Sequence, residues 1–206
     1  MDGTLLDLAY DNYFWHTYIP QQYALKHKCS IESTQAQLTK ILNEAKGTLN
    51  WYCTDFWSEK LSLNIAMLKT HTQHLITLRP DTLNFLSWLK KSPIKTVLLT
   101  NAHPDSLKIK MNETGIETFF EHMISSHTFG FAKEEAPFWP LLEKHFKFDK
   151  TRTVFIDDNE SVLNAAKSYG IGYLYTIHQP DSKEPPKFET IFPAIRNFEH
   201  LIPFSD

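Results

Sequence analysis

The chain has 206 residues, of which 42% are hydrophobic and 22% are charged, and its formal net charge at pH 7 is −3. These values are typical of a globular protein with one medium-sized domain, or one domain with a small insertion. The small negative charge and the lack of a dense basic run argue against a protein that binds nucleic acid or a membrane surface. No apolar stretch has the length of a membrane span, and the N-terminus lacks a secretory signal pattern, so we expect a cytoplasmic protein. The two cysteines, Cys29 and Cys53, do not have the spacing of a metal motif and are expected to be reduced, buried thiols.

The first third of the chain has a helical pattern. Residues 2–4 form an Asp-Gly-Thr turn signal with no strand before it. From residue 11 to about 74, apolar and aromatic residues recur at spacings of three and four, which predicts helices and no strands. Ser30 is the expected N-cap of the second helix. The predicted helices span residues 12–27, 31–44, 54–61 and 64–75. We expect a separate all-helical unit of four helices.

After residue 79, short apolar strands alternate with helices. Strands are predicted over residues 95–99, 122–125, 154–156 and 172–177. Helices are predicted over residues 81–91, 104–114, 134–145, 160–169 and 193–200. This alternation predicts parallel βαβ units, with helices covering both faces of the sheet. The predicted fold is therefore an α/β core, residues 1–10 and 79–206, with a small helical cap inserted at residues 11–78.

The most informative stretch is an apolar strand that ends in two acids. Residues 154–156 are Val-Phe-Ile, and Asp157 and Asp158 follow them directly. Asn159 can then cap the next helix. Open α/β sheets bind ligands at the carboxyl ends of their strands, and two adjacent carboxylates need a positive partner. Oxygen ligands suit Mg²⁺, so this stretch is a candidate metal site; the alternative is a capped turn with two solvated acids.

Other strand ends and turns carry polar residues of complementary chemistry. Residues 2–4 open the chain, Thr100 and Asn101 follow the predicted strand over 95–99, and Lys133 precedes a helix. A hydroxyl or amide donor, an ammonium group and carboxylate-bound Mg²⁺ are what a transferring phosphoryl group requires around its oxygens. Each residue alone is a weak signal, but their common placement predicts a phosphoryl-transfer site.

The order of these motifs resembles the haloacid dehalogenase (HAD) superfamily of phosphohydrolases. The helical insertion after the first motif resembles the small mobile cap of that superfamily, and the resemblance covers essentially the whole chain. A closer likeness is to the bacterial HAD nucleotidases that hydrolyse GMP and IMP. That likeness rests on the stretches DNYFW at 11–15, TLNWYC at 48–53, LTNAHP at 99–104 and SHTFG at 126–130. It implies a HAD-like Rossmannoid core.

The resemblance also implies roles for individual residues. In the family the first motif is Asp-x-Asp-Gly-Thr; its first Asp attacks phosphorus to form an aspartyl phosphate, and the second is the general acid and base. Asp2 matches the second Asp, and its main-chain carbonyl is also expected to face Mg²⁺. Thr100 is expected to hydrogen-bond the phosphoryl group, and Lys133 to neutralise it. Asp157 and Asp158 are expected to hold Mg²⁺.

The nucleophile of the family motif belongs two residues before Asp2, and Met1 occupies the intervening position. Asp7 lies beyond the turn and cannot replace it. We expect either that the start was assigned at an internal Met within the motif, which we favour, or that the protein is a truncated, inactive relative. Because the missing segment includes the first, central strand, we expect low stability or a gapped sheet, and no turnover of phosphate esters by the chain as written.

The substrate is expected to be a small phosphomonoester, most simply a purine nucleotide. Tyr13 and Trp51 belong to a group of aromatic residues in the cap that could stack on a purine, although the plainer interpretation is that such residues form the core of the cap. Thr4, Asn101 and His103 are further candidates for substrate contact. The alternatives are a phosphatase of sugar phosphates or other small phosphomonoesters, and a non-catalytic relative that binds phosphate and Mg²⁺.

Overall fold

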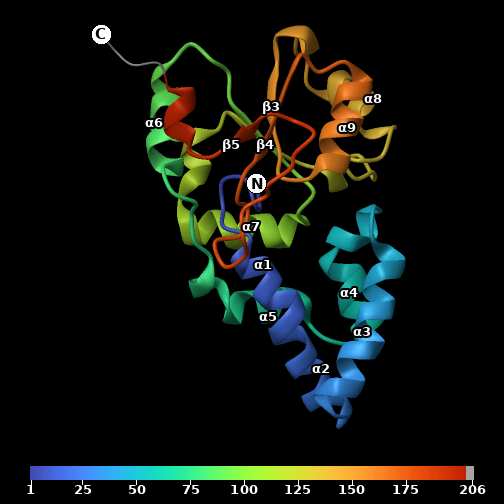
Figure 1. Ribbon diagram of the computed structural model, residues 1–206. Coiled ribbons are helices and arrows are strands. Elements are labelled where there is room, and N and C mark those ends of the chain that lie inside the picture. Colours follow the sequence, from blue (N-terminus) through green and yellow to red (C-terminus); the bar gives the residue numbers. More distant parts are fainter. Residues whose placement is uncertain (203–206) are drawn as a thin grey trace.

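The computed structural model describes residues 1–202 and shows a helical segment below an α/β core (Figure 1). α1 (Ala9–Tyr13) continues through a π-helical turn (Phe14–Tyr18) into α2 (Ile19–His27). The segment is completed by α3 (Ile31–Ala45), α4 (Thr54–Leu61) and α5 (Ile65–His71). None of the helices in residues 1–202 has the length and apolarity needed to cross a bilayer.

The helical segment has a core of its own, which explains why its helices form as the spacing predicts. Phe14, Trp57 and Ile65 are fully buried and pack with other apolar residues of the same segment. The N-cap expected at Ser30 is confirmed, because its side chain accepts a hydrogen bond from the backbone N–H of Ser33 (3.2 Å). The π-helical turn is an addition that spacing could not predict. Trp15 and His16 belong to this turn and line the cavity described below. Short π-helical segments are frequent at functional sites.

The α/β core contains parallel strands, as predicted. β1 (Val97–Thr100) pairs with β2 (His122–Ser125), while β3 (Val154–Ile156) pairs with β4 (Tyr173–Ile177), and β4 with β5 (Ala194–Ile195). The helices of the core are α6 (Thr82–Lys91), α7 (Pro104–Thr114), α8 (Phe138–His145) and α9 (Glu160–Tyr169). Figure 1 shows α6 on one side of the strands and α8 with α9 on the other.

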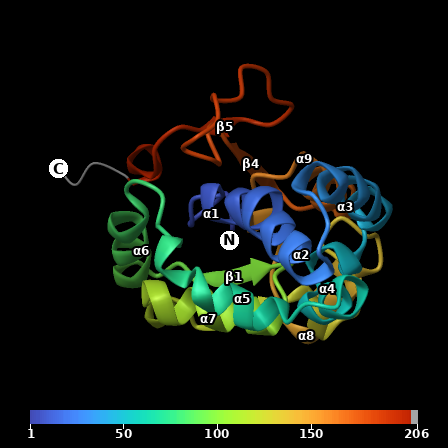
Figure 2. The ribbon, with the colours of Figure 1, turned by 90° about the horizontal axis from the view of Figure 1, so that it is seen from below.

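The strands form two separate sheets, β1-β2 and β3-β4-β5. A cavity of about 190 Å³ lies between them, and it is lined by Val97 and Leu99 on one side and by Val154 and Ile156 on the other. Within residues 1–202, the facing edges of β1 and β3 are therefore not hydrogen-bonded to a strand. This is the gapped sheet that we expected, and such unpaired backbone groups require water or another partner. The N-terminal end lies in the middle of the molecule (Figure 2), where Met1 is buried.

Two predicted helices were wrong in whole or in part. The helix predicted over 134–145 begins only at Phe138, because residues 134–137 form turns in which Glu134 and Glu135 accept hydrogen bonds through their side chains. The helix predicted over 193–200 is instead β5 followed by a 3-10 turn (Phe198–Leu201). Ala194 and Ile195 pair with the edge of β4, which gives hydrogen-bond partners to backbone groups that would lack them at the ends of a short helix. The cysteines are also only partly buried, contrary to expectation.

Candidate active site

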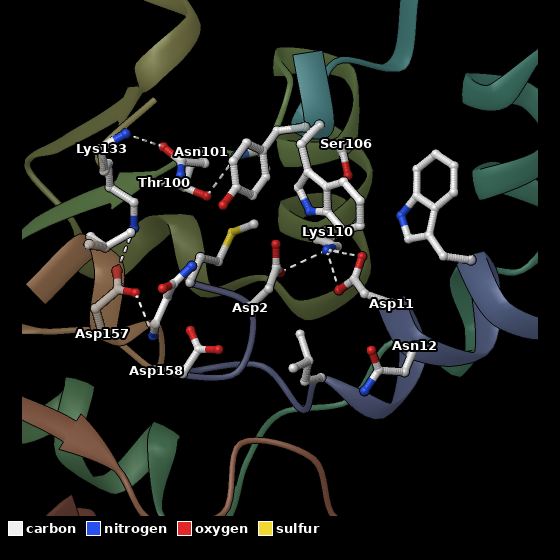
Figure 3. Close-up of a pocket in the computed structure, with 18 of the residues that line it drawn as sticks. Asp2, Asp11, Asn12, Thr100, Asn101, Ser106, Lys110, Lys133, Asp157 and Asp158 are labelled. Atoms are coloured by element: carbon white, nitrogen blue, oxygen red, sulfur yellow. Dashed lines mark hydrogen bonds and ion pairs between the residues drawn. The ribbon is translucent and has the colours of Figure 1, made fainter. Parts of the chain in front are cut away.

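A cavity of about 290 Å³ lies where the helical segment meets the core. Figure 3 shows that side chains from the first turn, the ends of β1 and β3, and helices α1 and α7 point into it. The lining residues that the sequence predicted are Asp2, Thr100, Asn101, Lys133, Asp157, Asp158 and Trp51. The topology explains this convergence, because the carboxyl ends of parallel strands meet at one edge.

The first wall of the cavity carries the two adjacent acids. Lys133 Nζ lies 2.5 Å from Asp157 Oδ2, and both side chains are buried. The other Asp157 oxygen accepts a hydrogen bond from the backbone N–H of Asn159 (3.0 Å), which positions the carboxylate at the helix start. Asp157 is thus already neutralised by a lysine.

Asp158 is in a different situation. Desolvation and the neighbouring Asp157 carboxylate raise the pKa of Asp158 to about 6. Among residues 1–202, no ion-pair partner contacts its carboxylate. A Cβ atom on Gly3, which has a φ of +66°, would lie only 2.5 Å from Asp158 Oδ2. Glycine is therefore required at this turn both for its left-handed backbone and for the close approach of the acid.

The opposite wall is a charge network that sequence reasoning missed. Lys110 Nζ lies 2.7 Å from Asp2 Oδ1 and 2.7 Å from Asp11 Oδ2 (Figure 3). Burial alone lowers the pKa of Lys110, but the two carboxylates outweigh it, so that the pKa is raised and the ammonium form is stabilised. Lys69 Nζ lies 3.5 Å from Asp11, and here burial prevails and lowers the pKa of Lys69 to about 8. Lys110 thus holds the predicted acid–base residue, Asp2, in the cavity.

The signal for this network was present in the sequence. Lys110 is only 1% exposed and lies on the buried face of α7 with Ser106 and Met111. Lys69 likewise shares the buried face of α5 with Ile65 and Leu68. A lysine at a position where the helical period requires an apolar residue indicates a buried charge with a partner. The period does not identify that partner.

A third cluster joins the helical segment to the core. The hydroxyl of Tyr52 donates to Glu134 Oε1 (2.8 Å), and Asn101 Nδ2 donates to Glu134 Oε2 (2.7 Å). Asn101 Oδ1 accepts from the backbone N–H of Lys133 (2.8 Å). Both ends of the Asn101 amide are therefore engaged by the protein, and its observed contacts position Lys133 and Glu134.

The remaining predicted residues occupy different places. Thr100 is buried at the cavity, and its Oγ1 accepts from the backbone N–H of Ala102 (3.1 Å), which leaves its O–H hydrogen available as a donor. Thr4 lines the cavity between the two sheets instead. Tyr13 is 39% exposed and stacks on Tyr18. The structure also places His103 outside the lining of the site cavity.

The donor set at the end of β3 fits the cation that the sequence predicts. Asp2, Asp157 and Asp158 line the same cavity and offer only oxygen ligands. The Asp158 side chain is partly buried, and its carboxylate forms no ion pair with a lysine among the described residues. Hard divalent cations such as Mg²⁺ prefer oxygen ligands of this type.

Comparison with known proteins identifies one matching family and two similar hydrolytic enzymes. The profile of the family described as haloacid dehalogenase-like hydrolase matches residues 1–175. A GMP/IMP nucleotidase, YrfG, from Escherichia coli is 39% identical over 203 residues, which cover 98% of this chain and 91% of that protein. An (S)-2-haloacid dehalogenase from Pseudomonas is 26% identical over 41% of this chain.

Solved structures share the fold at low sequence identity. A HAD phosphatase from Thermococcus onnurineus aligns with a TM-score of 0.78 at 18% identity, covering 98% of this chain and 93% of that one. The HAD-hydrolase YfnB from Bacillus subtilis, whose structure was determined with magnesium bound, aligns with a TM-score of 0.65 at 16% identity, with the same coverage. At these identities the structural likeness shows the fold alone.

Proposed function

Because the chain belongs to the haloacid dehalogenase-like hydrolase family, we propose that it is a Mg²⁺-dependent phosphomonoester hydrolase that prefers the purine nucleoside monophosphates GMP and IMP. The observation that carries this proposal is the convergence of Asp2, Thr100, Lys133, Asp157 and Asp158 on one cavity. The nucleotide preference is supported by the 39% identity to a GMP/IMP nucleotidase over nearly the whole chain.

Each residue of the cavity has a chemical task in this proposal. Asp2 protonates the leaving alcohol and later deprotonates the attacking water, while Lys110 holds its carboxylate in place. The Thr100 hydroxyl donates to the phosphoryl oxygens, and the Lys133 ammonium, buried next to Asp157, balances their charge. Asp2, Asp157 and Asp158 would hold Mg²⁺, which when bound supplies positive charge to the phosphoryl group.

The nucleophile is the part of the motif that this sequence does not include. The family pattern has an aspartate two residues before Asp2, which forms an aspartyl phosphate. Asp7 does not replace it, because its Oδ1 accepts from the backbone N–H groups of Ala9 and Ser182 and it does not line the cavity. Asp11 lines the cavity, but both of its oxygens are bound by Lys110. The proposed activity therefore requires an aspartate at the position two residues before Asp2, which neither Asp7 nor Asp11 can replace.

The helical segment would exclude water and recognise the base. Trp15 and Trp51 line the cavity from the helical segment, and aromatic faces bind purines well. Tyr52, which bonds to Glu134 of the core, holds the segment over the site. Excluding water from the site in this way favours phosphoryl transfer to the enzyme over direct attack of water on the substrate.

The test uses two forms of the protein, the 206-residue chain and the same chain extended by its in-frame upstream codons through the aspartate. Both are assayed with Mg²⁺ against GMP, IMP, AMP and a set of sugar phosphates. We expect hydrolysis only by the extended form, with the highest kcat/KM for GMP and IMP. Preference for sugar phosphates would support the rival phosphatase. Nucleotide binding without turnover by the extended form would support a non-catalytic relative and would contradict the proposal.

A further inference from the structure

Three side chains with metal-binding chemistry meet outside the site cavity. Cys53 is the N-cap of α4, His103 is the N-cap of α7, and His127 belongs to the 3-10 turn Ser126–Thr128 that follows β2. One candidate ligand atom from each lies within 4.8 Å of the other two. The residues come from three distant segments, so their spacing in the sequence gives no metal motif.

His127 supplies the strongest independent sign of a ligand. Its Nε2 atom is buried and has no hydrogen-bond partner among residues 1–202. Buried imidazole nitrogens are normally satisfied, so an open one indicates a partner that the protein chain does not provide.

His103 is oriented by contacts that are common for metal-binding histidines. Its ring lies edge-on to that of His127, with 4.9 Å between the ring centroids. The Thr54 hydroxyl is 2.7 Å from Nδ1, which also accepts a hydrogen bond from the backbone N–H of Asp105 (3.4 Å), and Nε2 lies 3.5 Å from the Asp55 carboxylate. Nδ1 is thus an acceptor in this structure, and Nε2 carries the proton that faces Asp55. Metal binding at Nε2 therefore requires the other tautomer, in which Nδ1–H donates to the Thr54 hydroxyl, as outer-shell hydrogen bonds do in many zinc sites.

We propose that Cys53, His103 and His127 form a site for a transition-metal dication of the Zn²⁺ class, with a fourth position open to water. Thiolate and imidazole ligands select such ions over Mg²⁺, so the site is chemically distinct from the oxygen donors of the active site. Binding forms a metal–sulfur bond and releases the thiol proton to solvent, with no change of oxidation state.

The geometry also implies a consequence of binding. A tetrahedral ion with bonds of about 2.0–2.3 Å separates its N and S ligands by about 3.3–3.6 Å, so ligand atoms that lie up to 4.8 Å apart would approach by up to about 1.5 Å. Cys53 belongs to the helical segment, whereas both histidines belong to the core. Cys53 also follows Tyr52, which already bonds to Glu134 of the core. Metal binding therefore fastens the helical segment to the core, and this consequence does not depend on the proposed substrate.

The first experiment titrates the metal-free 206-residue chain with Co²⁺ and Zn²⁺ in excess Mg²⁺. One equivalent of Co²⁺ should give a thiolate-to-metal charge-transfer band, which an ion held by carboxylates cannot produce. Cys53→Ser and His127→Gln should abolish this band or weaken Zn²⁺ binding by at least about tenfold. The matched control is Cys29→Ser, because Cys29 contacts Thr34 elsewhere in the helical segment, and it should bind as the unmodified chain does.

A second measurement needs no variant and so does not depend on correct folding of mutants. The rate of alkylation of Cys53 by iodoacetamide, read by mass spectrometry, should fall at least about tenfold when Zn²⁺ is added, because the coordinated thiolate is shielded. The rate at Cys29 should stay unchanged. Equal alkylation of Cys53 with and without Zn²⁺, or a charge-transfer band that persists in Cys53→Ser, would overturn the proposal.

Discussion

Replacing Lys110 with methionine tests the buried charge network of the site. Lys110 is 1% exposed and lies within 2.8 Å of carboxylate oxygens of both Asp2 and Asp11. Methionine preserves most of the volume but leaves the two acids without this cation. Asp11 keeps Lys69 at 3.5 Å, whereas Asp2 has no other ion-pair partner among residues 1–202.

The size of the effect follows from burial. Removing one partner of a buried ion pair costs about 3–5 kcal/mol, and the remaining Lys69–Asp11 contact places this variant near the lower end, at about 3 kcal/mol. For a chain of this length each kcal/mol shifts the unfolding midpoint by about 2–4 °C, so we expect a decrease of about 6–12 °C. Thermal and urea unfolding, followed by tryptophan fluorescence and circular dichroism, would measure it.

Two matched variants make this result interpretable. Lys108→Met alters an exposed lysine of the same helix and should change stability by less than about 0.5 kcal/mol. The double variant Lys110→Met with Asp2→Asn removes the charge that Lys110→Met leaves without a partner and should regain part of the loss. If Lys110→Met is as stable as Lys108→Met, or if the double variant is no more stable than the single one, the network does not have the energetic role that we assign to it.

Three further predictions concern other parts of the site. Gly3→Ala should destabilise the protein by at least about 1–2 kcal/mol, because alanine is strained at the positive φ of this position. It should also weaken Mg²⁺ binding in calorimetry, because the added Cβ would lie 2.5 Å from Asp158 Oδ2. Unchanged Mg²⁺ affinity would contradict this prediction. The free energy of unfolding should rise between pH 8 and pH 10, by up to about 2–3 kcal/mol, because burial lowers the pKa of Lys69 from 10.5 to about 8 and the unfolded chain then binds more protons. Lys69→Met should lack that rise in pH-dependent urea melts, and an identical slope would refute the assignment. Tyr52→Phe should lower stability by about 1.5–3 kcal/mol through loss of the bond to the Glu134 carboxylate and increase amide exchange in the helical segment; exchange that matches the unmodified chain would show that this bond does not hold the segment.

Much of the fold could be predicted because it depends on local signals. Helix α4 was predicted over 54–61 and spans Thr54–Leu61, and Ser30 caps α3 as expected. The strand at 154–156 followed by two acids predicted both the end of β3 and one wall of the site. In these cases the side-chain period and the capping residues act within a few positions of the chain.

Predictions failed where a distant contact competed with the local preference. Residues 193–200 have a helical pattern, but the open edge of β4 recruits Ala194 and Ile195 as a strand. Glu134 was expected to begin a helix, but its carboxylate is bound by Tyr52 and Asn101, which lie far away in the sequence. Local propensities are worth fractions of a kcal/mol, so a few tertiary hydrogen bonds override them.

The sequence alone determined the family, the α/β alternation with its helical insertion, and the set of acids, hydroxyl and lysine that converge at the strand ends. The order of the motifs and the spacing of the apolar residues can be read directly from the sequence. The carboxyl ends of parallel strands then meet at one edge of the sheet. Only the tertiary structure decided which charges pair and which stay open. Lys110 pairs with Asp11, 99 residues away in the sequence, and also with Asp2, and Cys53 meets His103 and His127 from three segments. Pairing of this kind depends on three-dimensional distance, because the energies of ion pairs and metal bonds fall off within a few ångströms, and sequence spacing does not record that distance.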